Sequence, residues 1–533
     1  MLRVSFIYYL SYKVLDTSAT VSCNVHIFTN RDLNRDSNSK HASELGNRIS
    51  CEVQNWTFIY ILNLMDIQNI NISGFVQSFE VSDEDKLEYG EIYSPFSLIE
   101  SMLDMFDKEV FSEKDARWLD PGAGTGYFSM CLFSRLNAGL EKVITNDEER
   151  HKHIVGNMIY MVEIKHSNVV ALKKMFGDDA NIVHSDFLST DMSLSFDYVI
   201  GNPPYNSHGM KKVPTDTKRD KKKDGRTVWT SFTRASISLL KPNGKLCFIV
   251  PSIWLKPDKA GMYDYLLSHK IEKLRCLSNT ETNREFKGKA QTPTCYFLLS
   301  NENTDFNISI YDKDRNEYIG YEFNPGEPIP VFGVSVVKKL RPYLDVVGCT
   351  AVSKTNLPKK TSKFSETMTK SYRHPNIRTC IIENLQPRLT INYSDAAQAF
   401  SGKSKLVMAH KMYGFPYIDL SGVFGISNRD NYVICDRTKD DMELLRAFFS
   451  TKTALYLFES TRYRMKYLEK YVFELVPDVT KLDDFPSIVN DETIADYFEF
   501  DDIDRQNIQT LHKKNYIFTP TENHQSNGIK DCT

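Results

Sequence analysis

Four consecutive residues, Asn202-Pro203-Pro204-Tyr205, combine groups that are suited to holding a small amine. Neither proline can donate a ladder hydrogen bond, so the apolar run that reaches Gly201 must end here and a stiff loop must follow. Such a loop presents the Asn202 amide oxygen and the Pro203 carbonyl as rigid acceptors, and Tyr205 as a flat stacking surface. Two acceptors that face one –NH2 group can bind both of its hydrogens. The sequence therefore predicts a site that binds an amino group.

A glycine-rich segment, DPGAGTG at 120–126, lies between an apolar run and a helix-like stretch. Gly122, Gly124 and Gly126 allow the backbone to approach a bound ligand closely, and the helix that follows offers free N–H groups. The spacing differs from the GxGxxG of dinucleotide-binding enzymes, and the segment lacks the lysine of a P-loop. A ligand-binding turn that starts at Asp120 is therefore predicted, although a simple tight turn between strand and helix can have the same composition.

Acidic residues follow the next two apolar runs. Asp147 comes about 20 positions after the glycines, where a carboxylate can accept hydrogen bonds from both hydroxyls of a ribose. Asp186 ends the third run and can accept from an exocyclic amine of adenine, while Phe187 covers the face of the ring. Both acids also have a simpler interpretation as helix-start residues. The spacing favours the ligand role for Asp147, whereas Asp186 and Phe187 taken alone fit a capping acid beside a core aromatic.

A parallel sheet is needed to bring these residues together. Short apolar runs alternate with helical stretches from about residue 115 onward, which is typical of a doubly wound α/β fold whose mostly parallel sheet is covered on both faces. Right-handed crossovers put the loops after the first four strands at one edge, where we expect a ligand to bind. Strands are predicted at 116–120, 142–147, 181–186, 196–202, 244–250, 273–277 and 292–299, and helices at 127–138, 149–163 and 227–240.

With these motifs the chain resembles the S-adenosylmethionine-dependent DNA adenine-N6 methyltransferases of restriction-modification systems, of the gamma type that carries NPPY. DPGAGTG matches the family's first motif and Asp147 its ribose-binding acid. The SDF at 185–187 matches its adenine-binding motif and the NPPY at 202–205 its catalytic motif. The resemblance covers 87–300. It implies a Rossmann-like methyltransferase fold and S-adenosyl-L-methionine as the cofactor.

Two further segments resemble parts of the same family. GEIYSP at 90–95 is similar to the segment that flanks the cofactor methionine, which assigns Tyr93 and Pro95 to cofactor binding. The family usually has Thr where this chain has Ser94. Phe286 precedes the last predicted strand, where the family has an aromatic that sandwiches the target base. An equally good interpretation is that Phe286 only packs in the core.

A basic run directly follows the NPPY segment. Residues 211–223 hold seven Lys or Arg and two Asp in thirteen positions. A run of this kind is usually a solvated face or a mobile loop. Beside a catalytic pocket it can contact a phosphate backbone, so Lys211 and Lys212 are predicted to bind the substrate.

The charge of the chain is segregated, although the formal net charge is only 66 − 69 = −3. Residues 338–411 hold 14 Lys or Arg and 4 Asp or Glu, whereas 474–505 hold 11 acidic and 2 basic residues. A basic surface of this kind suits a C-terminal α+β region that recognises a DNA target. The predicted division is an N-terminal extension of unknown role (1–85), the methyltransferase domain (86–302) and the target-recognition region (303–533).

The predicted reaction is direct methyl transfer from S-adenosylmethionine to the N6 amino group of an adenine in double-stranded DNA. The base must first be flipped out of the duplex, at a cost of a few kcal/mol. The reaction requires no covalent enzyme intermediate and no metal. The sequence has no convincing PD…(D/E)xK arrangement of a nuclease. Restriction at the same site is therefore expected from a separate cognate endonuclease.

Other functions are compatible with the NPPY motif. Enzymes that methylate an RNA base amine or a protein glutamine amide use it as well, N4 of cytosine is a related target, and a catalytically silent DNA-binding subunit would keep the fold. The long, partly basic C-terminal region favours DNA. No run of roughly 18 uncharged apolar residues is present, and we expect no secretory signal peptide. Ten cysteines occur without a CxxC pair, so we expect a cytoplasmic protein without membrane contact.

Overall fold

The computed structural model divides the chain into two compact units, Met1–Ile70 and Asn71–Thr533, and each is described by itself. In the first unit, β1 (Ile7–Tyr12) and β2 (Cys23–Phe28) form an antiparallel pair. The role of 1–85 stays unassigned. The structure describes these two strands and residues 94–207, 226–257, 260–288, 290, 292–355, 361–383, 386–410, 414–428, 431–463 and 468–511.

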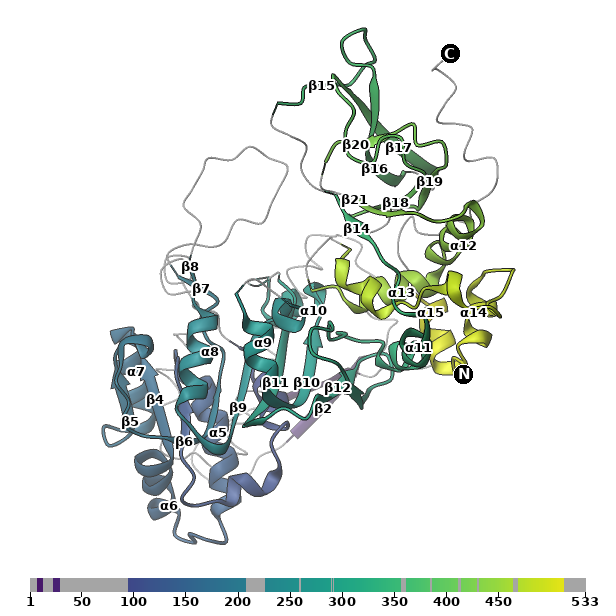
Figure 1. Cartoon of the computed structure of the whole chain (residues 1–533). Coiled ribbons are helices and arrows are strands. Elements are labelled where there is room, and N and C mark those ends of the chain that lie inside the picture. The colour runs from purple at the N-terminus through teal and green to yellow at the C-terminus, as the bar shows by residue number, and fades with distance from the viewer. Residues whose placement is uncertain are drawn as a thin grey trace. The chain divides into compact units, whose positions relative to one another are not determined.

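The second unit is built on a nine-stranded, mostly parallel sheet (Figure 1). Its order is β13-β12-β10-β11-β9-β6-β3-β4-β5, and β11 runs antiparallel to both of its neighbours. The chain proceeds from β3 outward to β5 and then returns to β6 on the other side of β3, so the order reverses between β3 and β6. Ligands of open α/β sheets bind at such a switch point, beyond the carboxyl ends of the strands. The predicted fold class is confirmed. The strands are β3 (Trp118–Asp120), β4 (Ile159–Glu163), β5 (Asn181–His184), β6 (Phe196–Gly201), β9 (Leu240–Pro251), β10 (His269–Leu277), β11 (Thr294–Asn303), β12 (Asn307–Asp312) and β13 (Glu317–Glu322).

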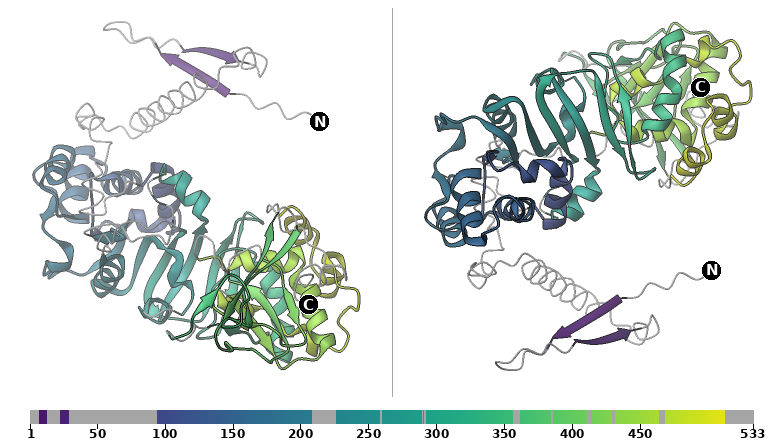
Figure 2. Two further views of the ribbon diagram at one scale, coloured as in Figure 1. Left: turned by 90° about the horizontal axis from the view of Figure 1, so that it is seen from above. Right: turned by 90° about the horizontal axis from the view of Figure 1, so that it is seen from below.

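Helices cover both faces of this sheet (Figure 2). Along β9, the Cys247 side chain faces α4 (Phe96–Leu103), since its Sγ lies 3.6 Å from the Met102 carbonyl oxygen. Phe248 points to the opposite face, as successive strand residues do, and belongs to the core that also contains Phe232 and Leu266. The helices are α4 (Phe96–Leu103), α5 (Tyr127–Leu140), α6 (Asp147–His153), α7 (His166–Phe176), α8 (Trp229–Ser238), α9 (Met262–Leu267) and α10 (Asn279–Glu285).

The strand predicted over 142–147 is wrong. After α5 the chain turns, and Asn146 caps α6 by accepting a hydrogen bond from the Glu149 backbone N–H at 2.9 Å. Val143 is 51% exposed, so this short apolar run has no core to face. The second parallel strand is β4, which falls inside the helix predicted over 149–163. Its residues are almost fully buried, and tertiary burial rather than local helix-forming tendency decides their conformation.

The C-terminal part is an α+β arrangement, as predicted. It contains two four-stranded sheets, and the second sheet packs against one face of β18 in the first. Leu406 and Met408 point into the main hydrophobic core, and Val407 points into a smaller core with Ile377 and Ile426. The first sheet has the order β14-β21-β18-β19 and the second β15-β17-β16-β20. The strands are β14 (Ser353–Lys354), β15 (Phe364–Ser365), β16 (His374–Glu383), β17 (Gln386–Ser394), β18 (Lys405–Ala409), β19 (Tyr417–Asp419), β20 (Gly425–Ile426) and β21 (Asn431–Cys435), and the helices are α11 (Val334–Val347), α12 (Lys439–Phe449), α13 (Lys452–Ser460), α14 (Asp491–Tyr497) and α15 (Asp502–Gln509).

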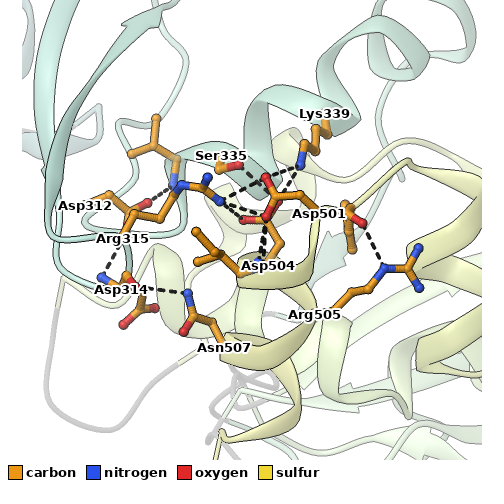
Figure 3. A network of polar contacts seen from close by, with 12 residues as sticks. Asp312, Asp314, Arg315, Ser335, Lys339, Asp501, Asp504, Arg505 and Asn507 are labelled. Atoms are coloured by element: carbon orange, nitrogen blue, oxygen red, sulfur yellow. Dashed lines mark hydrogen bonds and ion pairs between the residues drawn. The ribbon is translucent and has the colours of Figure 1, made fainter.

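A polar network joins the C-terminal helices to the far strands of the large sheet (Figure 3). Asp504 on α15 is buried, and its carboxylate accepts from Arg315 at 3.0 Å and from Lys339 on α11 at 2.6 Å. The main hydrophobic core also continues from Leu119 on β3 to Ile508 on α15. The sheet itself continues beyond residue 302 with β12 and β13. The division at 302/303 stays a prediction, and the structure adds that a cut there would separate strands of one sheet.

Candidate active site

The NPPY loop begins where β6 ends beside β3. A Cβ atom on Gly201 would lie 3.4 Å from Asp120 Oδ1, so the last residue of β6 and the last residue of β3 are close neighbours. Four residues later, the Tyr205 carbonyl accepts from the Val228 backbone N–H at 3.2 Å. The short hairpin of β7 (Asn206–Ser207) and β8 (Arg226–Thr227) lies between those two residues. The predicted catalytic loop is therefore anchored at both ends.

The Asn202 side chain is held by a residue from before α4. Its Nδ2 donates to Ser94 Oγ at 3.1 Å, and Ser94 is buried. Pro95 follows as the N-cap of α4, with its carbonyl accepting from Leu98 and Ile99. The structure thus brings the predicted GEIYSP segment and the NPPY loop into direct contact at Ser94.

The two predicted stacking aromatics lie against protein. Tyr205 is partly buried, and its hydroxyl lies 3.5 Å from the Ile249 carbonyl at the end of β9. Burial raises the pKa of Tyr205 well above its usual range. Phe286, at the C-cap of α10, is 3% exposed. Their stacking on a base stays a prediction, and for Phe286 the packed interpretation describes this structure.

The glycine turn after β3 is built around a buried carboxylate. Asp120 is 1% exposed, and Ser129 on α5 donates to its Oδ2 at 3.1 Å. Burial raises the pKa of Asp120 to about 7. Among the described residues, Asp120 Oδ1 and Thr125 Oγ1 are buried without a hydrogen-bond partner. Gly126 has φ +92°, and a Cβ there would lie 2.7 Å from Leu172, so only glycine fits this turn.

Glu163, which the sequence interpretation missed, ends the second strand at the glycine turn. Its Oε2 accepts from the Gly124 backbone N–H at 2.7 Å, and its Oε1 accepts from the Lys165 backbone N–H at 2.7 Å. Asp147 instead starts α6, with an 88% exposed side chain that pairs with Arg150 at 2.6 Å. The role predicted for Asp147 depended on a strand end that the structure does not have. The signal that could have found Glu163 is the apolar run 159–162 that ends in an acid.

Asp186 and Phe187 follow β5. The Asp186 carboxylate caps a single turn of 3-10 helix by accepting from the Leu188 backbone N–H at 3.0 Å. Phe187 is buried against Phe232 on α8, with ring centroids 5.3 Å apart. A Cβ atom on Gly122 would lie 3.8 Å from the ring of the same Phe232. The loop after β5 is therefore packed next to the glycine turn, and the structure matches the capping interpretation of Asp186.

Five further residues were predicted to bind the substrate or the cofactor. Pro95 and Gly124 lie in the contacts given above, whereas Tyr93, Lys211 and Lys212 lie outside the described residues. Pro203 and Pro204 continue directly from Asn202 in the loop. The loops after β3, β4, β5 and β6 thus meet at one sheet edge. There they combine neutral acceptors on one strand with carboxylates on its neighbours.

Comparison with known proteins agrees with this arrangement. Residues 123–281 match the family model of the Eco57I restriction-modification methylase. The segment that holds the site is similar to restriction-modification methylases. The predicted resemblance to restriction-modification methyltransferases is confirmed.

Relatives of the chain include type II methyltransferases. M.AccI of Acinetobacter calcoaceticus is 26% identical over 238 residues, which span 42% of this chain and 39% of the relative. M.PaeR7I of Pseudomonas aeruginosa is 26% identical over 205 residues, which span 34% of this chain and 35% of the relative. The chain therefore matches less than half the length of these curated relatives. Among solved structures, the M protein of the type I restriction enzyme EcoKI is 15% identical over 51% of this chain and 55% of that chain, with a TM-score of 0.32.

Within the part of the chain that the structure describes, every helix is too short or too polar to cross a bilayer.

Proposed function

We propose that this protein is a site-specific DNA methyltransferase that moves a methyl group from S-adenosylmethionine to the N6 amino group of adenine in duplex DNA. One observation carries the proposal. The Asn202 amide lies at the end of β6, held by Ser94, directly across the switch point from the glycine turn after β3. The similarity of 123–281 to restriction-modification methylases supports it.

The residues at the sheet edge fit S-adenosylmethionine. Asp120 Oδ1 and Thr125 Oγ1 are buried polar atoms that a ligand with an amino group can satisfy. Glu163, rather than Asp147, is the acid at the strand end where a carboxylate accepts from both ribose hydroxyls. Asp186, whose side chain is exposed, is suited to the exocyclic amine of the adenine ring, whereas Phe187 would cover the ring only after a change of packing. When bound, the cofactor supplies a methyl group on a positively charged sulfur.

The NPPY loop supplies the acceptors for the amine that receives the methyl group. The lone pair of adenine N6 is delocalised into the ring, so the nitrogen is a poor nucleophile. Asn202 Oδ1 and the Pro203 carbonyl, accepting one N–H each, favour tetrahedral geometry and localise that lone pair. The same acceptors stabilise the positive charge that develops on nitrogen, a preorganised electrostatic effect. Pro203 and Pro204 keep the loop stiff, so that the acceptors need not reorganise.

The target base must leave the duplex to reach this edge. Flipping costs a few kcal/mol, and stacking on an aromatic ring such as Tyr205 offsets about 1–3 kcal/mol of it. Tyr205 is partly buried before the base enters, so we propose that one face of its ring becomes the stacking surface once the base is bound. Phe286 would serve the same purpose only after a change of packing.

The C-terminal region is proposed to bind the DNA target. Three of its acidic residues are paired with basic side chains of the protein, because Asp501 and Asp504 pair with Arg315 and Lys339, and Asp478 pairs with Arg437. The basic residues Lys363, Lys370, Arg373 and Arg388 are exposed. An exposed basic surface favours phosphate contacts with strong salt dependence. We further propose that a separate endonuclease cuts the same site when it is unmethylated.

The proposal is tested by incubating the purified protein with methyl-labelled S-adenosylmethionine and long unmethylated duplex DNA. After digestion to nucleosides, the label is expected in N6-methyladenine, and the Asn202→Ala variant serves as the background control. Label in N4-methylcytosine would correct the target base. Label transferred only to RNA or protein, or none at all, contradicts the proposal.

A further inference from the structure

The contact between Ser94 and Asn202 joins two segments that are 108 positions apart. Asn202 Nδ2 donates to Ser94 Oγ at 3.1 Å, and Ser94 is only 4% exposed. The Ser94 side of the contact therefore lies inside the protein, and Asn202 is partly buried.

The Ser94 hydroxyl is held in place by the helix that follows it. α4 buries Leu98 and Ile99 against the sheet and α5, and its Phe96 ring lies 5.0 Å from the Tyr127 ring in an edge-to-face pair. Tyr127 is the first residue of α5, directly after the glycine turn. The position of Ser94 is thus fixed relative to both the glycine turn and the NPPY loop.

An asparagine amide does not orient itself. Its terminal torsion is broad, so in a loop the amide plane can rotate unless a partner fixes it. Nδ2 and Oδ1 point in different directions from the amide carbon, and a hydrogen bond at Nδ2 therefore sets the direction of Oδ1. In the proposed reaction Oδ1 must face the target amine.

We propose that Ser94 is a positioning residue that orients the Asn202 amide for methyl transfer. This inference rests on the proposed function of the NPPY loop. Ser94 acts through Asn202, so its hydroxyl contributes to the rate of the chemical step rather than to the affinity for cofactor or DNA. A misplaced catalytic group can cost up to about 100-fold in rate, and loss of one orienting bond is expected to cost about tenfold.

The test compares three variants in the full-length protein. Ser94→Ala removes the hydroxyl, and Ser94→Thr keeps it. Ser101→Ala removes a hydroxyl from α4, the helix that follows Ser94, where it donates to the Ser97 carbonyl at 2.8 Å. Single-turnover methylation of long unmethylated DNA is measured at saturating S-adenosylmethionine. Dissociation constants for S-adenosylmethionine and for DNA are measured separately.

Ser94→Ala is expected to slow methyl transfer about tenfold while both dissociation constants stay within about twofold of wild type. Ser94→Thr and Ser101→Ala are expected to react within about threefold of the wild-type rate. If Ser94→Ala does not fold, Ser94→Cys keeps the volume with a weaker acceptor and is expected to be several-fold slow.

Three outcomes separate this inference from the proposed function. A wild-type rate for Ser94→Ala overturns the positioning role. A loss of S-adenosylmethionine affinity equal to the loss of rate also overturns it, because Ser94 would then act on the cofactor. A wild-type protein that transfers no methyl group to DNA contradicts the proposed function itself.

Discussion

The two sides of the switch point use different chemistry. On the β6 side the polar groups are uncharged, and they comprise the Asn202 amide, the Pro203 carbonyl and the Ser94 hydroxyl. On the β3 and β4 side they are carboxylates, Asp120 and Glu163, which are both buried at the glycine turn. Neutral, rigid acceptors suit an amine whose charge develops only during the reaction, whereas carboxylates suit amino and hydroxyl groups of a ligand that is held throughout. In the proposed reaction, we therefore expect the rate and the affinity for the cofactor to depend on residues of different strands.

The largest effect is expected on the β6 side. Asn202→Ala removes one acceptor of the target amine, and we expect methyl transfer to fall by about 100- to 1000-fold. The dissociation constant for S-adenosylmethionine is expected to stay within about twofold, since Asn202 is proposed to contact the target and not the cofactor. Both quantities are measured on the same preparation. A loss of cofactor affinity as large as the loss of rate would erase the contrast between the two sides.

The role of the carboxylates in cofactor binding is tested by comparing substitutions of two acids. Glu163→Ala removes the proposed ribose acceptor and is expected to weaken S-adenosylmethionine binding by about 10- to 100-fold, as measured by calorimetry. Asp147→Ala is the matched control, because the exposed Asp147 side chain pairs with Arg150 and not with the glycine turn. The affinity of this variant for S-adenosylmethionine is expected to be unchanged.

Glu163 also accepts from the backbone of the glycine turn, so the melting temperature of Glu163→Ala must be checked. Glu163→Gln keeps one acceptor and is expected to bind with intermediate affinity. Weakened binding in Asp147→Ala with unchanged binding in Glu163→Ala would restore the original assignment of Asp147.

The pH dependence of cofactor binding tests the buried carboxylate. The pKa of Asp120 is raised to about 7 by burial, so the carboxyl is protonated in weakly acidic solution. An ionised Asp120 attracts the cationic amino group of the cofactor, and we expect affinity to rise by up to about tenfold per pH unit between pH 5.5 and 7 and then to level off. Asp120→Asn is expected to bind weakly and without this dependence.

The same group makes the ligand-free protein less stable as pH rises. Its folded-state pKa lies above the unfolded value of 3.8, so its contribution to stability is complete below 3.8 and is lost as pH rises through about 7. Melting temperatures of wild type and Asp120→Asn measured over this range check the sign. A wild-type slope no different from that of the variant would contradict the raised pKa.

The smallest effect is expected far from the sheet edge. Lys370→Ala removes one exposed positive charge from the basic segment, residues 338–411. We expect the affinity for DNA to fall by a few-fold on all sequences. The slope of log affinity against log salt concentration is expected to become shallower by about one. Lys439→Ala on α12, which lies outside the basic segment, is the control. Equal effects of the two substitutions on binding to DNA would remove the special role of residues 338–411.

Local chemistry explains which parts could be predicted from the sequence. The turn at Gly126 and the loop at Pro203 follow from backbone restrictions of single residues, so their position at strand ends was predicted correctly. The position of the second strand was not predicted correctly. The run that ends at Ile144 and the run that ends at Glu163 are both apolar, and only burial in the folded sheet distinguishes them. The Ser94–Asn202 contact spans 108 positions, and no local pattern encodes such a pairing.

The most direct test of the central claim is sequencing of modified bases in DNA from cells that express the wild-type protein or Asn202→Ala. We expect N6-methyladenine at one short sequence context with the wild-type protein, and none at that context with the variant. The absence of any new modified base with the wild-type protein, or a modification that persists in Asn202→Ala, would contradict the assignment of Asn202 as the acceptor for the target amine.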